Sequence, residues 1–583
     1  MRLNNIKERA MQGVFFLTAL ASIAAVVLIC IFLFYNGVPA MAEIGFFNFI
    51  GGSEWAPTNV PASYGIFTMI IGSIYVTAGA VVIGVPIGIL TAVFLARFCP
   101  KPLYKVIKPA TELLAGIPSI VYGFFGLMVI VPFIRENFGG NGSSLLAASI
   151  VLGIMILPTI IGVSESAIRA VPENYYEGAL ALGATRERSV FKTMLPAAKS
   201  GILAGVVLGI GRAIGETMAV ILIAGNQVQI PTSLTDGVRT LTANIVLEMG
   251  YSTGLHRQAL IATGVVLFVF ILIITLSMQA IKSRSEKMAE NNEIKAINKT
   301  GFAQRLREYK RKPLSLVLFI LVVLAAALSV LALIFLIVYI LVMGIPHITP
   351  DLFAWEYNSD NVSCMPAIIN TIIVTLLTLA IAVPFGVGAA IYLAEYAKRG
   401  NKFVKLIRTM AETLSGIPSI VYGLFGMLFF VTTLQWRLSL LAGSFTLAIM
   451  VLPTIMRTTE EALLSVPDSY REGSYGLGAG KLRTIAKVIL PSAMPGILAG
   501  IILAVGRIVG ETAALLYTSG SASGLANGLM SSGRTLAIHM YVLANEGLHT
   551  DQAWATAVVL LVLVLLINTL SAFIAKKLTS KNK

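Results

Sequence analysis

Two near-identical segments place an arginine and a glutamate inside stretches that are otherwise apolar. The sequence GRAIGET spans 211–217 and recurs as GRIVGET at 506–512. An ionisable residue at membrane depth costs roughly 2.5–3.5 kcal/mol on insertion scales, so its presence there calls for a functional explanation. A guanidinium can hold two oxygens of an oxyanion, and it stays charged at physiological pH. The pattern therefore predicts that Arg212 and Arg507 line the path of an anion.

The composition is that of an integral membrane protein. Of the 583 residues, 57% are hydrophobic and 12% are charged, and the charged fraction is about half that of a typical soluble protein. Apolar windows of about 20 residues are each long enough for a helix that crosses a bilayer. We therefore expect an all-α polytopic protein with about twelve transmembrane helices, which begin near residues 14, 66, 110, 144, 201, 258, 315, 367, 410, 438, 495 and 553.

The basic excess follows the expected topology. The net charge is +15, and if the N-terminus is cytoplasmic, 36 of the 43 Lys and Arg residues lie on the cytoplasmic side, 5 lie outside and 2 lie within the membrane. This is the positive-inside bias of membrane proteins, and it gives no reason to expect a nucleic-acid partner. We expect a multi-pass protein of the cytoplasmic (inner) membrane with both termini in the cytoplasm. Residues 1–35 resemble a signal peptide, but their apolar run is too long for one and predicts the first span.

The chain is an internal duplication. The sequence GIPSIVYG at 116–123 recurs at 416–423, an offset of 300, and LPT at 157–159 recurs at 452–454, an offset of 295 that also relates the two GR-x-x-GET segments. Each half holds six spans, an even number, so both halves enter the membrane in the same direction and form a parallel repeat. We expect two transmembrane domains, 1–281 and 315–583, joined by a basic cytoplasmic linker at 282–314.

A cytoplasmic segment lies between the fourth and fifth spans of each half, at 165–200 and at 458–494. In the first copy Pro172 suits a helix start, Gly183 suits a C-terminal cap, and Pro196 suits the end of a second short helix. The expected structure is two short helices around a glycine turn.

These two segments resemble the coupling loop of ABC-importer permeases. The pattern Glu-Gly-Ala, then Gly, then Leu-Pro in the first copy returns at the same spacing, with Glu-Gly-Ser, in the second. The resemblance implies that both loops dock into a cytoplasmic ATPase. The residues that it assigns to this coupling are Tyr175, Glu177, Gly183, Tyr470, Glu472 and Gly478.

A narrower resemblance covers nearly the whole chain. The first half, with GIPSIVYGFFGL and LGIGRAIGETMAV, is similar to one permease subunit of the phosphate-specific ABC transporter, and the second half, with GRIVGETAALLY and RTLAIHMY, is similar to the other. The family usually encodes these C-type and A-type subunits as separate chains, so the fusion departs from its pattern. The resemblance implies a MetI-like permease fold, phosphate as the transported anion, a homodimeric ATPase and an extracytoplasmic phosphate-binding protein.

The glutamate of each GR-x-x-GET segment has several interpretations. Residues i and i+4 share a helix face, so Arg212 could form a structural salt bridge with Glu216, and Arg507 with Glu511. Alternatively, the carboxylate accepts a hydrogen bond from a protonated anion, which phosphate is at neutral pH and sulfate is not. It could also weaken anion binding by tempering the arginine charge.

Four further residues are candidates for the pathway. Pro118 and Pro418 fall inside predicted spans, where each removes a backbone hydrogen bond and kinks its helix, either as a gate or as a plain packing feature. The external loops 225–257 and 519–552 each hold one aligned arginine, Arg239 and Arg534, which either meet the substrate or a binding protein, or are simply solvated.

The chain is expected to be a transport permease and not an enzyme. It lacks a G-x-x-x-x-G-K-[ST] nucleotide-binding loop, so ATP would be used by the partner ATPase, and we expect no cofactor and no metal site in the chain itself. The alternative function is an ion-coupled secondary carrier for an oxyanion, which would not need the cytoplasmic loops. A membrane enzyme such as a lipid phosphatase is disfavoured, because no nucleophile or general base lies near the arginines in the sequence.

Overall fold

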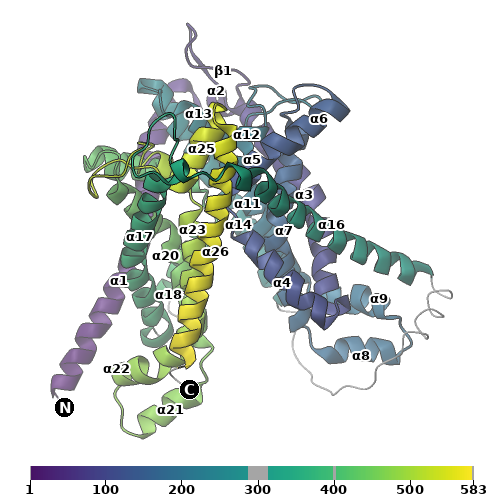
Figure 1. The fold of residues 1–583 in the computed structure, drawn as a ribbon. Coiled ribbons are helices and arrows are strands. Elements are labelled where there is room, and N and C mark those ends of the chain that lie inside the picture. Colours follow the sequence, from purple (N-terminus) through teal and green to yellow (C-terminus); the bar gives the residue numbers. More distant parts are fainter. Residues whose placement is uncertain (1, 287–312, 398–401, 581–583) are drawn as a thin grey trace.

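The computed structural model describes residues 2–286, 313–397 and 402–580, and the chain in these ranges is predominantly helical (Figure 1). The first half begins with the long helix α1 (Arg2–Ile44), the short helix α2 (Phe46–Gly51) and an antiparallel hairpin of β1 (Trp55–Ala56) and β2 (Ser63–Tyr64). Its other helices are α3 (Phe67–Val93), α4 (Lys101–Ala115), α5 (Ser119–Phe125), α6 (Val131–Phe138), α7 (Leu145–Ala170), α8 (Glu173–Ala181), α9 (Arg186–Ser189), α10 (Leu195–Ala197), α11 (Lys199–Gly215), α12 (Met218–Ile223), α13 (Leu241–Glu248) and α14 (Gly254–Glu286).

The second half repeats this order. Two 3₁₀ turns, η4 (Ile345–His347) and η5 (Pro350–Phe353), replace the hairpin after its first helix. The α-helices are α16 (Pro313–Gly344), α17 (Met365–Ile391), α18 (Lys402–Ser415), α19 (Ser419–Gly426), α20 (Leu440–Leu464), α21 (Asp468–Gly476), α22 (Lys481–Thr484), α23 (Leu490–Val509), α24 (Ala513–Leu516), α25 (Leu536–Glu546) and α26 (Thr550–Ser580).

Short π-helical turns occur at equivalent places in the two halves. Because a single π turn inserts one extra residue into a helix and often lies near a functional site, its duplication indicates a feature of the repeat itself. The three pairs are η1 (Phe94–Phe98) with η6 (Tyr392–Tyr396), η2 (Gly126–Ile130) with η7 (Met427–Thr433), and η3 (Val190–Met194) with η8 (Ile485–Ile489).

The predicted spans are found at the expected positions. In the part of the chain that the structure describes, ten helices are long and apolar enough to cross a membrane, or up to eleven if the bent pair Arg186–Ala197 and Lys199–Gly215 counts as one span. The remaining predicted position is filled by a shorter apolar helix, Ser419–Thr433. The expectation of an all-α, multi-pass membrane fold is confirmed.

The expected kinks at Pro118 and Pro418 are wrong, because neither proline lies inside a helix. The amphipathic helices α4 and α18 end before them, and each proline is the N-cap residue of the next helix, with φ −58° and ψ 143° at Pro118 and φ −61° and ψ 147° at Pro418. Proline disfavours the helical conformation of the residue before it, so the helix breaks instead of bending. The apolar helices therefore begin about nine residues later than the sequence suggested.

The first helix of each half packs on both halves (Figure 1). Helix α1 contacts α14 of its own half and α17 of the second, and α16 contacts α26 of its own half and α3 of the first. The close approaches use small residues: the Thr91 and Ser329 hydroxyl oxygens are 2.9 Å apart between α3 and α16, and a Cβ on Gly388 of α17 would lie 2.7 Å from Thr18 Oγ1 of α1. The halves are therefore interlocked and do not merely abut.

The two loops that we expect to be cytoplasmic have the predicted helix pair and glycine turn. Gly183 and Gly478 both have φ +81°, a left-handed conformation that suits glycine just after a helix. The second short helix of the first loop, Arg186–Ala197, ends one residue after Pro196, and the chain then bends by 75° into Lys199–Gly215. In the second half Lys481–Val509 is a single span. Figure 1 shows α8 and α9 below one half and α21 and α22 below the other, at the end of the molecule where α1 starts and α26 finishes.

The predicted linker at 282–314 lies mostly outside the described residues, which end at Glu286 in α14 and resume at Pro313 in α16. The structure therefore leaves the boundaries of the two predicted domains, 1–281 and 315–583, as predictions.

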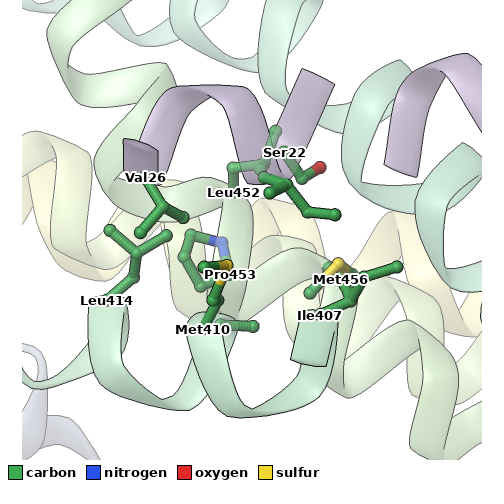
Figure 2. Close-up of a pocket in the computed structure, with 10 residues that line it drawn as sticks. Ser22, Val26, Ile407, Met410, Leu414, Leu452, Pro453 and Met456 are labelled. Atoms are coloured by element: carbon green, nitrogen blue, oxygen red, sulfur yellow. The ribbon is translucent and has the colours of Figure 1, made fainter. Parts of the chain in front are cut away.

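A small pocket lies between α1 and the helices α18 and α20 of the second half (Figure 2). Its lining is apolar except for Ser22, whose hydroxyl donates to the carbonyl oxygen of Thr18 in the same helix. Because no charged group lines it, this pocket does not have the chemistry of an anion site. The lining residues are Ser22, Ile23, Val26, Ile407, Met410, Ala411, Leu414, Leu452, Pro453 and Met456.

Candidate functional site

Each GR-x-x-GET segment marks the end of a membrane helix. Helix α11 ends at Gly215, and Glu216 follows in an extended conformation with φ −71° and ψ 131°. Helix α23 ends at Val509, two residues before Glu511. The expectation that each arginine and glutamate share a helix face is therefore wrong, because the helix stops between them.

The two glutamates bind the backbone of the short helices that follow. The Oε1 atom of Glu216 accepts hydrogen bonds from the N–H groups of Met218 and Ala219, at 3.1 and 3.2 Å, at the start of α12. Glu511 Oε1 accepts two comparable bonds at the start of α24, at 3.2 and 3.1 Å. A carboxylate is favourable at a helix N-terminus, because the first N–H groups of a helix lack partners within it.

The arginines are half-buried and form no ion pair with these glutamates. Arg212 Nη1 lies 3.3 Å from the hydroxyl of Thr159, in the LPT sequence of α7. None of the ion pairs among the described residues includes Arg212 or Arg507. The structural salt bridge considered from the sequence is therefore absent from this part of the chain, and both guanidinium groups keep donors that no carboxylate occupies.

The two segments meet at the contact between the halves. A Cβ on Gly215 of the first half would lie 3.3 Å from Pro418 of the second, and a Cβ on Gly510 of the second would lie 3.3 Å from Pro118 of the first. Glu511 also interacts electrostatically with Arg507 of its own segment and, more weakly, with Glu216 of the first half. Each GR-x-x-GET segment therefore lies beside the proline of the opposite half.

Within each half the GIPSIVYG helix packs on the short helix that the glutamate caps. A Cβ on Gly123 of α5 would lie 2.6 Å from the Cα of Ala219 in α12, and a Cβ on Gly423 of α19 would lie 3.0 Å from the Cα of Ala514 in α24. Only glycine allows this approach, because a methyl group there would overlap backbone atoms. The two repeated motifs are therefore one structural unit in each half.

Arg239 lies in a structural network on the external side. Its Nη1 atom lies 2.6 Å from Glu248 Oε1 and 3.1 Å from Asn244 Oδ1, and its Nε donates to the carbonyl oxygen of Asn226. Glu248 also accepts from Trp55 Nε1 at 2.8 Å and lies 2.8 Å from His256 Nε2. This arginine is compensated by an acid, which does not favour it as an anion contact.

Arg534, the equivalent residue of the second half, has a different environment. It is 3% exposed, its guanidinium lies over the ring of Tyr357 at 4.5 Å, and its Nε and Nη2 atoms have no hydrogen-bond partner among the described residues. His539 beside it is fully buried, and burial together with the Arg534 charge lowers the pKa of His539 to about 3. Arg534 is therefore buried and not solvated as one interpretation expected.

The predicted coupling residues lie on the cytoplasmic loops with their apolar side chains outward. Tyr175 and Tyr470 are exposed, and Leu182 and Leu477 at the tips are 90% and 91% exposed. Glu472 is exposed and Glu177 is half-buried, while Gly183 and Gly478 form the turns described above. Large apolar side chains this exposed in both repeats indicate surfaces that a partner covers.

Ion pairs that the sequence reasoning missed connect each loop to the end of the second span. Arg97 binds Glu173 of α8 at 2.7 Å, whereas in the second half Glu395 accepts from Arg471 of α21 at 2.7 Å, so the polarity is reversed. Burial opposes the charge of Arg471, but its hydrogen bonds to Glu395 raise its pKa above the usual value. Arg97 and Glu395 have equivalent places in η1 and η6, but the offset of 295 relates Glu173 to Asp468 and Arg471 to Tyr176, so the alignment of the two halves does not predict the second pair.

A second missed pair recurs with the same polarity. Lys108 of α4 lies 2.9 Å from the buried Glu165 of α7, and Arg408 of α18 binds Glu460 of α20. The offsets of 300 and 295 relate these residues, so a search for charges in apolar segments would have found them. Among the described residues, no three His, Cys, Asp or Glu side chains are grouped to hold a metal ion.

Comparison with known proteins gives a family for both halves. Residues 84–287 and 382–582 each match the family described as binding-protein-dependent transport system inner membrane component. The chain is 41% identical over 271 residues to the probable ABC transporter permease protein YqgH of Bacillus subtilis, covering 46% of this chain and 88% of that protein. It is 28% identical over 571 residues to the phosphate transport system permease protein PstA homolog of Mycoplasma pneumoniae, covering 88% of this chain and 86% of that protein.

Other relatives cover about half of the chain. The phosphate transport system permease protein PstC of Mesorhizobium japonicum is 36% identical over 281 residues, 44% of this chain and 85% of that protein. A structure of the MetNI methionine ABC transporter matches 37% of this chain and 94% of its own with 22% identity and a TM-score of 0.30. The matches at 84–287 and 382–582 show that the chain belongs to the family of binding-protein-dependent transport system inner membrane components.

Proposed function

We propose that this chain is the transmembrane permease of an ATP-driven importer of inorganic phosphate. The names of relatives that match half of the chain, and of one that matches most of it, support phosphate as the substrate. The observation that carries the proposal is that each GR-x-x-GET segment packs against the proline of the opposite half, while Arg212 and Arg507 are half-buried and form no ion pair among the described residues. An anion at this contact can receive one guanidinium from each half.

The geometry gives the arginines and glutamates separate roles. Each guanidinium donates two parallel N–H bonds to a phosphate oxygen pair, and its charge compensates the loss of the anion's water shell. Glu216 and Glu511 are held in place by backbone N–H groups on Oε1. A phosphate hydroxyl can donate a hydrogen bond to such a carboxylate. Sulfate has no proton to donate at neutral pH, so the carboxylate would lack this partner.

The driving energy comes from a separate cytoplasmic ATPase in this proposal. The exposed Leu182 and Leu477 at the loop tips supply one apolar contact for each ATPase subunit, so we expect an ATPase homodimer. The ion pairs of Glu173 and Arg471 then transmit loop movements to the ends of the second spans. The loops lie at the end of the molecule where α1 starts and α26 finishes, which supports cytoplasmic termini in the inner membrane (Figure 1).

An extracytoplasmic phosphate-binding protein is expected to deliver the substrate at the opposite end. The hairpin of β1 and β2 and the helices α13 and α25 lie there (Figure 1). In this arrangement Pro118 and Pro418 act at the gate, because each contacts the glycine that ends the pathway helix of the other half. A movement of either half therefore changes the spacing of the two arginines.

Reconstituted transport tests the function. The full chain, its ATPase and its binding protein are placed in vesicles, and uptake of labelled phosphate is measured with ATP, with a non-hydrolysable analogue, and against excess sulfate or molybdate. We expect uptake that requires ATP hydrolysis and that sulfate does not compete. Equal uptake without ATP would overturn the importer in favour of an ion-coupled carrier, and preferential uptake of sulfate would overturn the substrate assignment.

A further inference from the structure

The external arginines of the two halves are equivalent in sequence but have different partners. The offset of 295 relates Arg239 to Arg534, Asn244 to His539, and Glu248 to Leu543. In the first half Glu248 neutralises the arginine at 2.6 Å. In the second half the acid is replaced by a buried leucine, which is 1% exposed, so the cation remains while its counter-charge is missing.

The polar groups around Arg534 are also unsatisfied. In the described part of the chain, the hydroxyl of Thr535 and both ring nitrogens of His539 lack a partner in hydrogen-bond geometry, although the backbone of Val362 faces the His539 ring. The equivalent hydroxyl in the first half, of Thr240, bonds with Thr242 and accepts from the backbone. Unpaired buried polar groups are costly, and several together indicate a group that belongs among them.

The free donors of Arg534 lie on one edge of its guanidinium. The guanidinium carbon is 4.5 Å from the centre of the Tyr357 ring, a cation–π contact in which no N–H group is used as a hydrogen-bond donor. The two atoms without partners, Nε and Nη2, are on the same edge of the guanidinium, and their N–H bonds point in parallel. This edge is the one that holds two oxygens of a carboxylate or phosphate side by side.

We propose that the Nε–Nη2 edge of Arg534 binds a small inorganic oxyanion at the external end of the second half. The anion replaces the carboxylate that Glu248 supplies in the first half, and Thr535 and neutral His539 offer further hydrogen bonds. The choice of phosphate as the occupant rests on the proposed function, whereas the site itself rests on the missing counter-charge. The two external arginines thus have different roles: Arg534 is an anion contact and Arg239 is a structural residue.

Stacking on Tyr357 alone does not account for this arrangement. A cation–π contact satisfies the face of a guanidinium but forms no hydrogen bond with its N–H groups, and it supplies no negative charge. Tyr357 itself is only half-buried, on the segment between α16 and α17. An anion that enters beside this ring completes both the charge and the donors of Arg534.

Anion-dependent stability of the purified full-length chain in detergent, without ATPase or binding protein, tests the site. The Tm is measured in sodium phosphate, sodium sulfate and sodium chloride at constant ionic strength. We expect phosphate to raise the Tm of the wild type by about 1–3 °C, since a ligand that binds only the folded state stabilises it. Leu543→Glu restores the acid of the first half beside Arg534. In this variant the protein should stay folded, and the rise in Tm that is due to phosphate bound at Arg534 should be lost.

A matched variant separates charge from shape. Leu543→Gln has the same size as Leu543→Glu but no charge, so its Tm should still rise with phosphate, and Arg534→Gln should behave like Leu543→Glu. An equal phosphate response in the wild type, Leu543→Glu and Arg534→Gln would overturn the proposal. A response to chloride alone would overturn the oxyanion assignment. Because no transport is measured, failure of the importer proposal would leave these outcomes unchanged.

Discussion

Gly215 of the first half packs against Pro418 of the second, and the reciprocal contact joins Gly510 to Pro118. A Cβ added to either glycine would come within 3.3 Å of the opposite proline ring, which is closer than nearly all Cβ contacts in proteins. Each glycine ends the helix that carries a pathway arginine or lies directly after it. A side chain at either glycine therefore requires the opposite proline to move by a few tenths of an ångström.

A larger residue at Gly215 should impair transport more than folding. Gly215→Val forces the two halves apart at the contact with Pro418, at a cost of about 1–3 kcal/mol for overpacking. We expect ATP-dependent uptake to fall about tenfold or more, with a correctly assembled protein in the membrane. Uptake by vesicles and the Tm of the purified variant measure the two effects.

Gly211 provides the control in the same segment. A Cβ at Gly211 would meet nothing within 4 Å, so Gly211→Ala should transport like the wild type and be slightly more stable, because alanine favours the helix. If Gly211→Ala and Gly215→Val lost uptake equally, the contact with Pro418 would not explain the effect.

Removal of either pathway arginine should abolish uptake. Arg212→Gln and Arg507→Gln keep a polar side chain but lose the charge and the bidentate donor pair, and we expect uptake to fall by about 10²-fold or more. Lysine at either position retains charge without the fork and should restore only part of the rate. Binding of the ATPase, measured by pull-down, should not change.

Arg457 supplies a matched control for the arginine variants. It forms an exposed pair with Glu461, with both side chains more than half exposed. Arg457→Gln should leave uptake near that of the wild type. Normal uptake in both Arg212→Gln and Arg507→Gln would contradict the assigned pathway.

The reversed ion pairs of the coupling loops allow a charge-swap experiment. Arg471 and Glu395 are 14% and 5% exposed, so Arg471→Glu places two acids together in a buried site and should detach α21 from the second span. The double variant Arg471→Glu with Glu395→Arg restores the pair in the polarity of the first half. We expect a coupling energy of about 1–3 kcal/mol from the double-mutant cycle.

ATPase stimulation reports whether this pair transmits movement. In the single variant, substrate delivery should no longer stimulate ATP hydrolysis, while the double variant should recover the stimulation. Recovery of stability without recovery of stimulation would assign the pair to folding alone.

His539 should make the protein less stable in acid. Burial and the charge of Arg534 lower its pKa from 6.5 in the unfolded chain to about 3 in the fold. Between these values the unfolded state binds a proton that the folded state does not, so stability is present above pH 6.5 and is lost as the pH falls towards 3. The variant His539→Asn, which has the residue of the first half, should show a smaller fall of Tm between pH 6.5 and 4.

Identical Tm profiles for the wild type and His539→Asn would show that the imidazole protonates equally in both states.

The sequence anticipated the elements well and the local geometry less well. Apolar windows located every span, and glycine chemistry located the turns at Gly183 and Gly478, since these signals are local. The expected shared helix face of Arg212 and Glu216 failed, because the periodicity of the segment gives no sign that α11 ends at Gly215. Pro118 was misplaced because an amphipathic helix and an apolar helix follow each other within one apolar window.

By itself, the sequence determined that the chain is a duplicated membrane protein with a charged motif in each half and two cytoplasmic loops. Composition, repeat offsets and turn residues can be followed along the chain without knowing which helices pack together. Only the tertiary structure decided which charges are compensated. Glu248 neutralises Arg239. Among the described residues, Arg534 has Leu543 in place of that acid and forms no ion pair, and Arg212 forms no ion pair with Glu216. Compensation depends on distances between side chains from different helices, and a difference of one residue type at an equivalent position changes it.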